Sequence, residues 1–246
     1  MIRLLKCEFG KFKRTYINSL SFLGMMFPVF LTFVVFLIKK DDFVKAGSYN
    51  WDNFNSQLTI FFVLLLGPII TSFIAVFSVY YEYQQLTIKN MLMAPYGRIQ
   101  VILTKIIYVS LFVLLQYVFV AAVNILSAFF LGFDVTFEKA EEFTRQLLLA
   151  GLSTVMLVPL MIFITLIFKS FIAPMVVTVA GTLSNVLMLN WEKSYLSPFA
   201  IPADISFIIT KQTEMNAMYP IVSACIYFTV FMAVTLIYFK KADQSV

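Results

Sequence analysis

The chain has 246 residues, of which 61% are hydrophobic and 13% are charged; its mean hydropathy is +0.91 and its net charge is +5. Soluble domains carry about 25% charged residues, so this composition excludes an ordinary soluble globular protein. The chain has no histidine and only two cysteines, Cys7 and Cys225, so we expect no metal site and no disulfide.

Residues 1–19 are predicted to form an amphipathic helix at the membrane surface. Leu5, Phe9, Phe12 and Tyr16 recur at steps of three or four and therefore share one face, while the basic residues lie mostly between them. Such a helix lies along the inner leaflet with its cations toward anionic headgroups. A simple positively charged anchor is the alternative. The residues assigned to this interfacial helix are Arg3, Lys6, Phe9, Phe12, Lys13 and Arg14.

Six long apolar stretches follow, and none of them contains Asp, Glu, Lys or Arg. About 20 residues of α-helix cross the hydrocarbon core of a bilayer, and a charge at mid-membrane costs about 3 kcal/mol or more. We therefore predict an all-α membrane protein with six transmembrane helices and a single transmembrane domain, residues 1–246. The predicted spans are residues 20–38, 58–80, 106–130, 147–168, 171–189 and 218–239.

The charges beside the spans predict the orientation of the chain. With six spans, the segments on the side of the two termini carry 11 basic residues, whereas the segments on the other side carry 7. Cytoplasmic loops are enriched in Lys and Arg. We therefore expect a multi-pass protein with both termini in the cytoplasm.

The connection between the second and third spans, residues 81–104, is the longest cytoplasmic loop in this topology. It combines Leu and Met side chains with few charges, and Pro95 and Gly97 divide it into two short helical pieces. An exposed cluster of Met and Leu on a short helix is typical of a docking surface. Packing of the loop against the protein's own membrane ends is the alternative.

Two outer connections also have an unusual composition. Residues 190–216 are too apolar for a solvated loop and too short to cross the membrane, so we predict a re-entrant or interfacial element there, before the last span. Irregular backbone at membrane depth must be covered by protein or line a cavity. Residues 133–146 contain three glutamates and are predicted to be a solvated acidic helix; attraction of a cationic peptide is the alternative.

Polar side chains at membrane depth are the candidates for a substrate path. Such groups either form hydrogen bonds between helices or line the path of a cargo, and the residue types alone do not separate these roles. Together with two residues of the apolar outer connection, the candidates are Gln116, Asn124, Asn185, Pro198 and Phe199.

The sequence lacks the motifs of a self-driven transporter. It contains no G-x-x-x-x-G-K-[ST] motif, so we expect no ATP bound through a phosphate-binding loop. No span holds an ionisable group of the kind that ion-driven transporters use. We expect no catalytic residues, no cofactor on this chain and no nucleic-acid partner, and active transport would take its energy from another subunit.

Two segments resemble a known family. In residues 82–105, a Glu is followed by the turn LTIKNMLMAP, then by Arg and Lys, and this order is similar to the cytoplasmic loop of ABC type-2 export permeases. Leu86 stands where that family commonly has Gly, and Gly97 stands where it commonly has Ser. Residues 4–14 are similar to the opening of small bacterial members, which include permeases for lantibiotic immunity and bacitracin resistance.

The resemblance implies a complex of two permeases, of like or unlike chains, with a dimer of ABC ATPases that holds ATP and Mg²⁺. In such a complex the loop is the coupling helix, which docks in a cleft of the ATPase, and the amphipathic start is the connecting helix beside it. The residues that the resemblance assigns to ATPase coupling are Glu82, Lys89, Met91, Leu92, Met93, Pro95 and Arg98.

The resemblance also implies a bacterial cell membrane protein that expels an antimicrobial peptide or a similar amphiphile, as in bacteriocin immunity and antibiotic resistance. Two alternatives stay open. One is an ABC permease for another lipid-like cargo, and the other is a membrane sensor or assembly subunit that docks a soluble partner.

Overall fold

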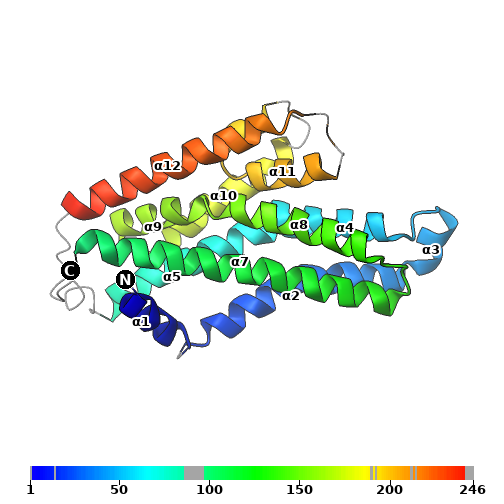
Figure 1. The fold of residues 1–246 in the computed structure, drawn as a ribbon, viewed down its shortest axis with the longest axis horizontal. Coiled ribbons are helices and arrows are strands. Elements are labelled where there is room, and N and C mark those ends of the chain that lie inside the picture. Colours follow the sequence, from blue (N-terminus) through cyan, green and yellow to red (C-terminus); the bar gives the residue numbers. More distant parts are fainter. Residues whose placement is uncertain are drawn as a thin grey trace.

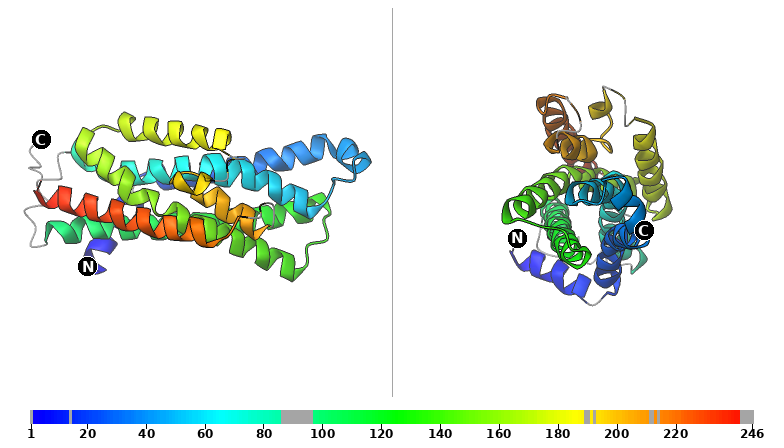
Figure 2. Two further views of the ribbon diagram at one scale, coloured as in Figure 1. Left: turned by 90° about the horizontal axis from the view of Figure 1, so that it is seen from above. Right: turned by 90° about the vertical axis from the view of Figure 1, so that its right-hand side faces the viewer.

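The computed structural model describes residues 2–13, 15–85, 97–188, 191, 193–210, 213 and 215–241. These residues form a helical bundle that is elongated along one axis, and α1 crosses it near one end (Figures 1 and 2). The elements are α1 (Ile2–Lys13), α2 (Ile17–Ile38), α3 (Lys40–Lys45), α4 (Trp51–Thr59), the π-helix η1 (Ile60–Leu66), α5 (Gly67–Gln84), α7 (Arg98–Leu131), α8 (Phe137–Thr154), α9 (Leu157–Phe168), α10 (Ile172–Met188), the 3₁₀-helix η2 (Ser194–Leu196), α11 (Ile201–Ile209) and α12 (Met218–Lys241).

Five helical segments of the described chain are long and apolar enough to cross a membrane. Three of them are α2, α7 and α12; the fourth runs through α4, η1 and α5, and the fifth runs through α8 and α9. The helix α10 matches the predicted span 171–189 but has only 17 residues, which is about 26 Å of helix. The described residues therefore contain five candidate spanning segments, and the sixth span stays a prediction.

The helices begin and end at other residues than the predicted spans do. α7 begins at Arg98 rather than at residue 106, and α8 begins at Phe137 rather than at residue 147. An uncharged stretch marks only the membrane core, whereas a helix ends where its terminal groups are capped. The side chain of Asn50 caps α4, and Gly132 with a φ of +78° ends α7.

The acidic connection of residues 133–146 forms the first part of α8. Glu138, Glu141 and Glu142 are exposed there, whereas Phe143 and Leu147 are buried. This outcome agrees with the predicted acidic helix, but the helix continues without a break into the apolar residues that follow it.

The helices pack in pairs around α7 and α9. α7 lies against α2 and α8, whereas α9 lies against α5 and α12. Figure 1 shows α12 diverging from α9 toward its N-terminal end, where α11 lies between α12 and α8. Only 6% of the apolar window of α12 is buried, the lowest value among the five spanning segments, so most of α12 faces outward.

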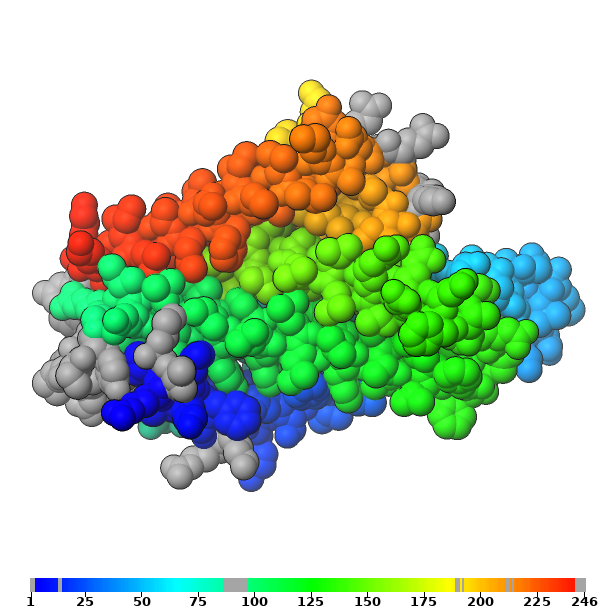
Figure 3. Space-filling model, in the orientation of Figure 1, coloured from blue at the N-terminus to red at the C-terminus, as the bar shows by residue number. Residues whose placement is uncertain are grey.

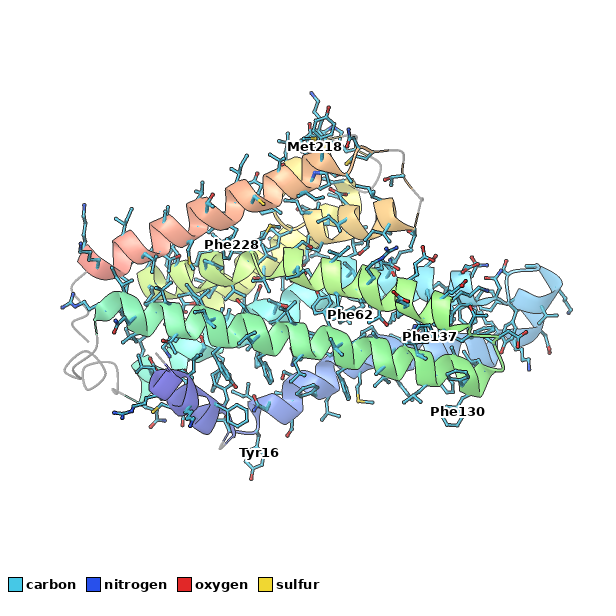
Figure 4. The ribbon with its side chains drawn as sticks, in the orientation of Figure 1. Tyr16, Phe62, Phe130, Phe137, Met218 and Phe228 are labelled. Carbon is cyan, nitrogen blue, oxygen red and sulfur yellow. The ribbon has the colours of Figure 1, made fainter. Side chains whose placement is uncertain are left out.

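Tyr117 of α7 occupies the centre of the bundle, where two glycines leave room for it. Its hydroxyl group lies 3.0 Å from Oγ1 of Thr154, and its ring centroid lies 4.9 Å from that of Phe62, which points into the interior in Figure 4. A Cβ atom on Gly67 would lie 2.5 Å from the Tyr117 hydroxyl oxygen, and one on Gly151 would lie 2.9 Å from the ring carbon Cγ. The close approach of α5 and α8 to α7 therefore requires glycine at both positions.

Large apolar side chains cover the outside of the bundle. Tyr16, Phe130, Phe137 and Met218 are all exposed, and Figure 4 shows them on the outer surface of the bundle. Exposed apolar side chains are typical of a surface that faces lipid, and aromatic rings are favoured at the level of the headgroups.

Candidate functional site

A cluster of four charged side chains lies where α1, α5 and α7 meet. Nζ of Lys105 donates to Glu82 Oε1 at 2.6 Å, to the Ser78 carbonyl oxygen at 2.9 Å, and at 3.4 Å to Glu8 Oε2. Nζ of Lys11 donates to the same two carboxylates, at 2.7 Å to Glu82 and 3.0 Å to Glu8. We call Glu8, Lys11, Glu82 and Lys105 the four-charge cluster.

Three side chains of the four-charge cluster are buried, the Lys11 side chain is 36% exposed, and the four described charges balance. Glu8 and Glu82 are each 3% exposed and Lys105 is 1% exposed. Buried charges are tolerated only when they are paired and hydrogen-bonded, and here two carboxylates face two ammonium groups. Burial lowers the pKa of Lys11, but Glu82 and Glu8 outweigh it, so the pKa of Lys11 is raised.

The aromatic side chain of Phe12 holds the C-terminal end of α1 against the bundle. It is buried, and its ring centroid lies 4.8 Å from that of Tyr108, 6.1 Å from that of Phe77 and 6.4 Å from that of Phe112. The aromatic contacts and the four-charge cluster thus fasten the same helix to both α5 and α7.

The remaining residues assigned to the interfacial helix have different positions. Arg3, Lys6 and Phe9 are exposed, Lys13 is the last residue of α1, and Arg14 lies outside the described residues. The predicted extent of residues 1–19 is wrong, because α1 ends at Lys13 and α2 begins at Ile17. Residues 17–19 belong to α2 instead. In the next turn of α2, Ser21 accepts a hydrogen bond from Gln116 of α7.

The residues assigned to ATPase coupling fall mostly between α5 and α7. Glu82 is in the last turn of α5, and Arg98 is the exposed first residue of α7. The others, Lys89, Met91, Leu92, Met93 and Pro95, lie outside the described residues. Both ends of this segment start from the end of the bundle that holds the four-charge cluster, and the docking role of the segment stays a prediction.

The polar side chains at membrane depth form hydrogen bonds between elements. Nε2 of Gln116 donates to Ser21 Oγ of α2 at 2.7 Å, and Nδ2 of Asn124 donates to Asn55 Oδ1 of α4 at 2.7 Å. Nδ2 of Asn185 donates to the Phe199 carbonyl oxygen at 2.8 Å. All three amides are buried, and these contacts support the role of holding helices together.

The structure brings only some of the substrate-path candidates together. Asn185, Pro198 and Phe199 lie at one place, where the Phe199 ring packs over Gly181 of α10; a Cβ atom on Gly181 would lie 2.5 Å from that ring. Gln116 and Asn124 bond to other elements. The assignment of these residues to a substrate path stays a prediction.

The apolar outer connection is structured mainly by α11. This short helix packs against α8 and α12, and its residues Ile201, Pro202, Ala203 and Ser206 are buried. Residues 201–209 are helical rather than irregular, so backbone groups of this part are satisfied within α11. Whether it enters the membrane from the outer side stays a prediction.

Asp204 of α11 is expected to make stability depend on pH. Burial raises the pKa of its carboxyl group to about 6, although the hydrogen bonds from Ser194, at 2.9 Å, lower it. The folded state therefore binds a proton that the unfolded state releases near pH 3.8, so stability falls as pH rises from about 4 to about 6. Asp204→Asn is expected to stabilise the protein at pH 7.5 by about 1–2 kcal/mol, less than the full shift because the side chain is part-exposed.

Thermal unfolding of the detergent-solubilised protein at pH 5 and pH 7.5 measures this effect. The stabilisation should be about half as large at pH 5, where the unfolded carboxyl group is already ionised but the folded one is still mostly protonated. Asp134→Asn, at an exposed position of another outer connection, is the matched control. Equal stabilisation by Asp204→Asn at both pH values would contradict the assigned titration.

Sequence reasoning missed part of the four-charge cluster. Glu8 and Lys11 are spaced by three residues on one helix, which indicates a pair, and Lys105 is a single charge directly before an apolar stretch. These signals do not indicate burial, because burial depends on how α1 crosses α5 and α7.

Comparison with known proteins agrees with this architecture. Residues 4–185 match the family described as ABC-2 family transporter protein. The bacitracin transport permease protein BCRB of Bacillus licheniformis is 24% identical over 192 residues, which cover 76% of this chain and 90% of that protein. The match includes α1, the four-charge cluster and the helices from α2 through most of α10. The chain, a multi-pass helical membrane protein, therefore belongs to the ABC-2 family of transporter permeases.

Proposed function

We propose that the chain is the transmembrane subunit of an ATP-binding-cassette exporter in a bacterial cell membrane. It works with a dimer of ABC ATPases, which carry ATP and Mg²⁺, and with a second permease. The observation that carries this proposal is the position of the four-charge cluster, which joins α1, α5 and α7 beside the segment between α5 and α7.

The segment between α5 and α7, residues 85–97, is called the docking segment, and the four-charge cluster gives it a stiff attachment. When the ATPase dimer closes on ATP, it moves the segment that contains Leu92 and Met93, whose apolar side chains anchor it in the ATPase. Because Glu82 is bonded to both Lys11 and Lys105, a displacement of α5 is passed to α1 and α7 at the same time. The bundle then shifts as a rigid body instead of bending at one helix.

The proposed orientation has both termini in the cytoplasm. α1 and the C-terminal end of α12 lie toward the same end of the bundle in Figure 1, in agreement with the prediction from charge. The four-charge cluster and the docking segment are then on the cytoplasmic side, where the ATPase is. The ends of α4, α8 and α11 that lie toward the opposite end face outward.

The proposed cargo is an antimicrobial peptide or a similar amphiphile, and the proposed direction is out of the membrane. The bacitracin transport permease among the relatives supports this cargo class. The uncharged spans also favour cargo that is partly embedded in lipid over an ion, because an ion needs charged or polar partners along its path.

Met93→Asp is expected to abolish co-purification of the chain with its ABC ATPase. A carboxylate at an apolar docking position is desolvated without a partner, which costs several kcal/mol. Pull-down of the ATPase from detergent-solubilised membranes measures the association. Leu196→Asp places the same charge at an exposed apolar residue toward the opposite end of the bundle, so it should leave the association intact. Normal association of Met93→Asp would contradict the docking role.

The same purified complex tests the cargo. Reconstituted with its ATPase in vesicles, the complex should hydrolyse ATP faster when bacitracin is added, and the chain alone should transport nothing. Transport by the chain without an ATPase would overturn the proposed function.

A further inference from the structure

A pocket of about 280 Å³ lies between α4, α8 and the C-terminal end of α11. In Figure 3 the surface steps down at this place from α11 in orange to α8 in green and α4 in cyan. Gln146 lines the pocket, and Phe168, the last residue of α9, follows it by 22 residues along α8 and α9. This separation corresponds to about 33 Å of helix, close to the thickness of the hydrocarbon core. Because Phe168 lies near the cytoplasmic end, the pocket is at the outer membrane surface in the proposed orientation.

Two buried amide side chains in the wall of this pocket each leave one polar group without a hydrogen-bond partner among the described residues. Asn55 is 7% exposed, and its Oδ1 accepts from Asn124, but no hydrogen bond from its Nδ2 to any described residue is formed. Gln146 is 3% exposed, and its Nε2 donates to Thr59, whereas its Oε1 accepts from none of the described groups. Both residues line the pocket. The pocket therefore offers a hydrogen-bond donor and an acceptor, the complement of a peptide group, which has one C=O and one N–H.

The rest of the wall suits a cationic and partly apolar peptide. Trp51 and Phe143 pack edge to face with their centroids 5.7 Å apart, and both line the pocket. Asp52, Lys139 and Glu142 are exposed at its rim, so the described part of the rim carries two carboxylates and one ammonium group. This excess of negative charge favours an ammonium-bearing ligand over an anionic one.

We propose that this pocket binds a short segment of a cationic peptide at the outer face of the protein. Asn55 and Gln146 bond a peptide group, the aromatic pair contacts an apolar side chain, and Asp52 and Glu142 attract an amine. The pocket is smaller than the sites that enclose whole drug-sized ligands, so it holds only part of the cargo. This inference deepens the proposed function by specifying what part of an antimicrobial peptide is recognised, and where.

The test measures binding of fluorescently labelled bacitracin to the purified chain in lipid nanodiscs, without ATPase. The double variant Asp52→Asn with Glu142→Gln should bind it about three- to tenfold more weakly, as expected for the loss of two exposed ion pairs. The control Glu138→Gln with Glu141→Gln removes two exposed charges from α8, at positions outside the pocket wall, and should change binding less than twofold. Bacitracin whose primary amines are acetylated should bind with the same affinity to the unchanged protein and to both double variants.

Lys139 supplies a second readout with the opposite sign. Lys139→Met removes a like charge beside the proposed amine site, so it should strengthen the binding of bacitracin by about two- to threefold. Weaker binding would show that Lys139 attracts an anionic group of bacitracin, and would overturn the proposal. Equal losses in the two carboxylate double variants would also overturn it, because they would show a general effect of charge.

These outcomes are separable from a failure of the proposed function. Binding is measured without ATPase, so a failed Met93→Asp test leaves the result of the binding test unaffected. If bacitracin binds in the pocket but does not stimulate ATP hydrolysis by the complex, the pocket assignment stands and the cargo assignment does not.

Discussion

Replacing Lys105 with methionine is expected to destabilise the protein by about 3–5 kcal/mol, the usual cost of removing one partner from a buried ion pair. Among the described residues, Glu8 and Glu82, each 3% exposed, would then face the single ammonium group of Lys11 instead of two. We also expect the docking segment to lose its stiff attachment. Thermal unfolding of the detergent-solubilised protein measures the first effect, and ATPase stimulation by bacitracin in the reconstituted complex measures the second.

Two further variants provide the controls for this prediction. Lys240→Met removes a lysine from the exposed C-terminal turn of α12, so it should change stability by less than about 0.5 kcal/mol. The double variant Glu8→Gln with Lys105→Met leaves Glu82 paired with Lys11, at 2.7 Å, and should recover a substantial part of the loss. No recovery would mean that the lost packing of the lysine stem, rather than an unbalanced charge, causes the destabilisation.

Alanine at either glycine beside Tyr117 is expected to destabilise the bundle by about 1–3 kcal/mol, the usual cost of overpacking a core. At Gly151 the new Cβ atom would lie 2.9–3.3 Å from the base of the ring, at Cγ, Cδ1 and Cβ of Tyr117. At Gly67 it would lie 2.5 Å from the hydroxyl oxygen and 2.9 Å from the Phe62 carbonyl oxygen. Thermal unfolding of both variants measures these effects.

The substitution Tyr117→Phe separates the two contacts. It removes the hydroxyl oxygen, so it should partly rescue Gly67→Ala, but it leaves the base of the ring in place and should not rescue Gly151→Ala. Gly24→Ala is the matched control in another spanning helix, because its Cβ atom would meet only the end of the flexible Ile70 side chain, at 3.2 Å. Similar losses of stability in all three alanine variants would indicate a general effect on membrane helices, and would contradict the specific need for glycine beside Tyr117.

The membrane character of the chain could be predicted from the sequence because it depends on local properties. Length, apolarity and the absence of charge belong to each stretch separately, and five of the predicted spans correspond to long helices in the structure. The helix ends were predicted less well, since capping by residues such as Asn50 and Gly132, and not hydropathy, ends a helix. The sixth span stayed unconfirmed because α10 has only 17 residues.

Long-range contacts account for what the sequence could not predict about the site. Glu82 was a candidate for the coupling region from the motif, but its bond to Lys105 and the approach of Glu8, 97 residues away from Lys105, depend on how α1 crosses the bundle. The polar residues Gln116 and Asn124 were recognised at membrane depth, yet their partners Ser21 and Asn55 lie on other helices.

The sequence by itself determined that this protein is a helical membrane protein, which face of its first helix is apolar, and that no phosphate-binding loop for ATP is present. Only the tertiary structure decided which charges are buried together and which amide groups stay open toward the pocket between α4, α8 and α11. The physical reason is that hydropathy and charge act residue by residue along the chain. Burial and pairing, in contrast, arise from the packing of helices that are distant in sequence.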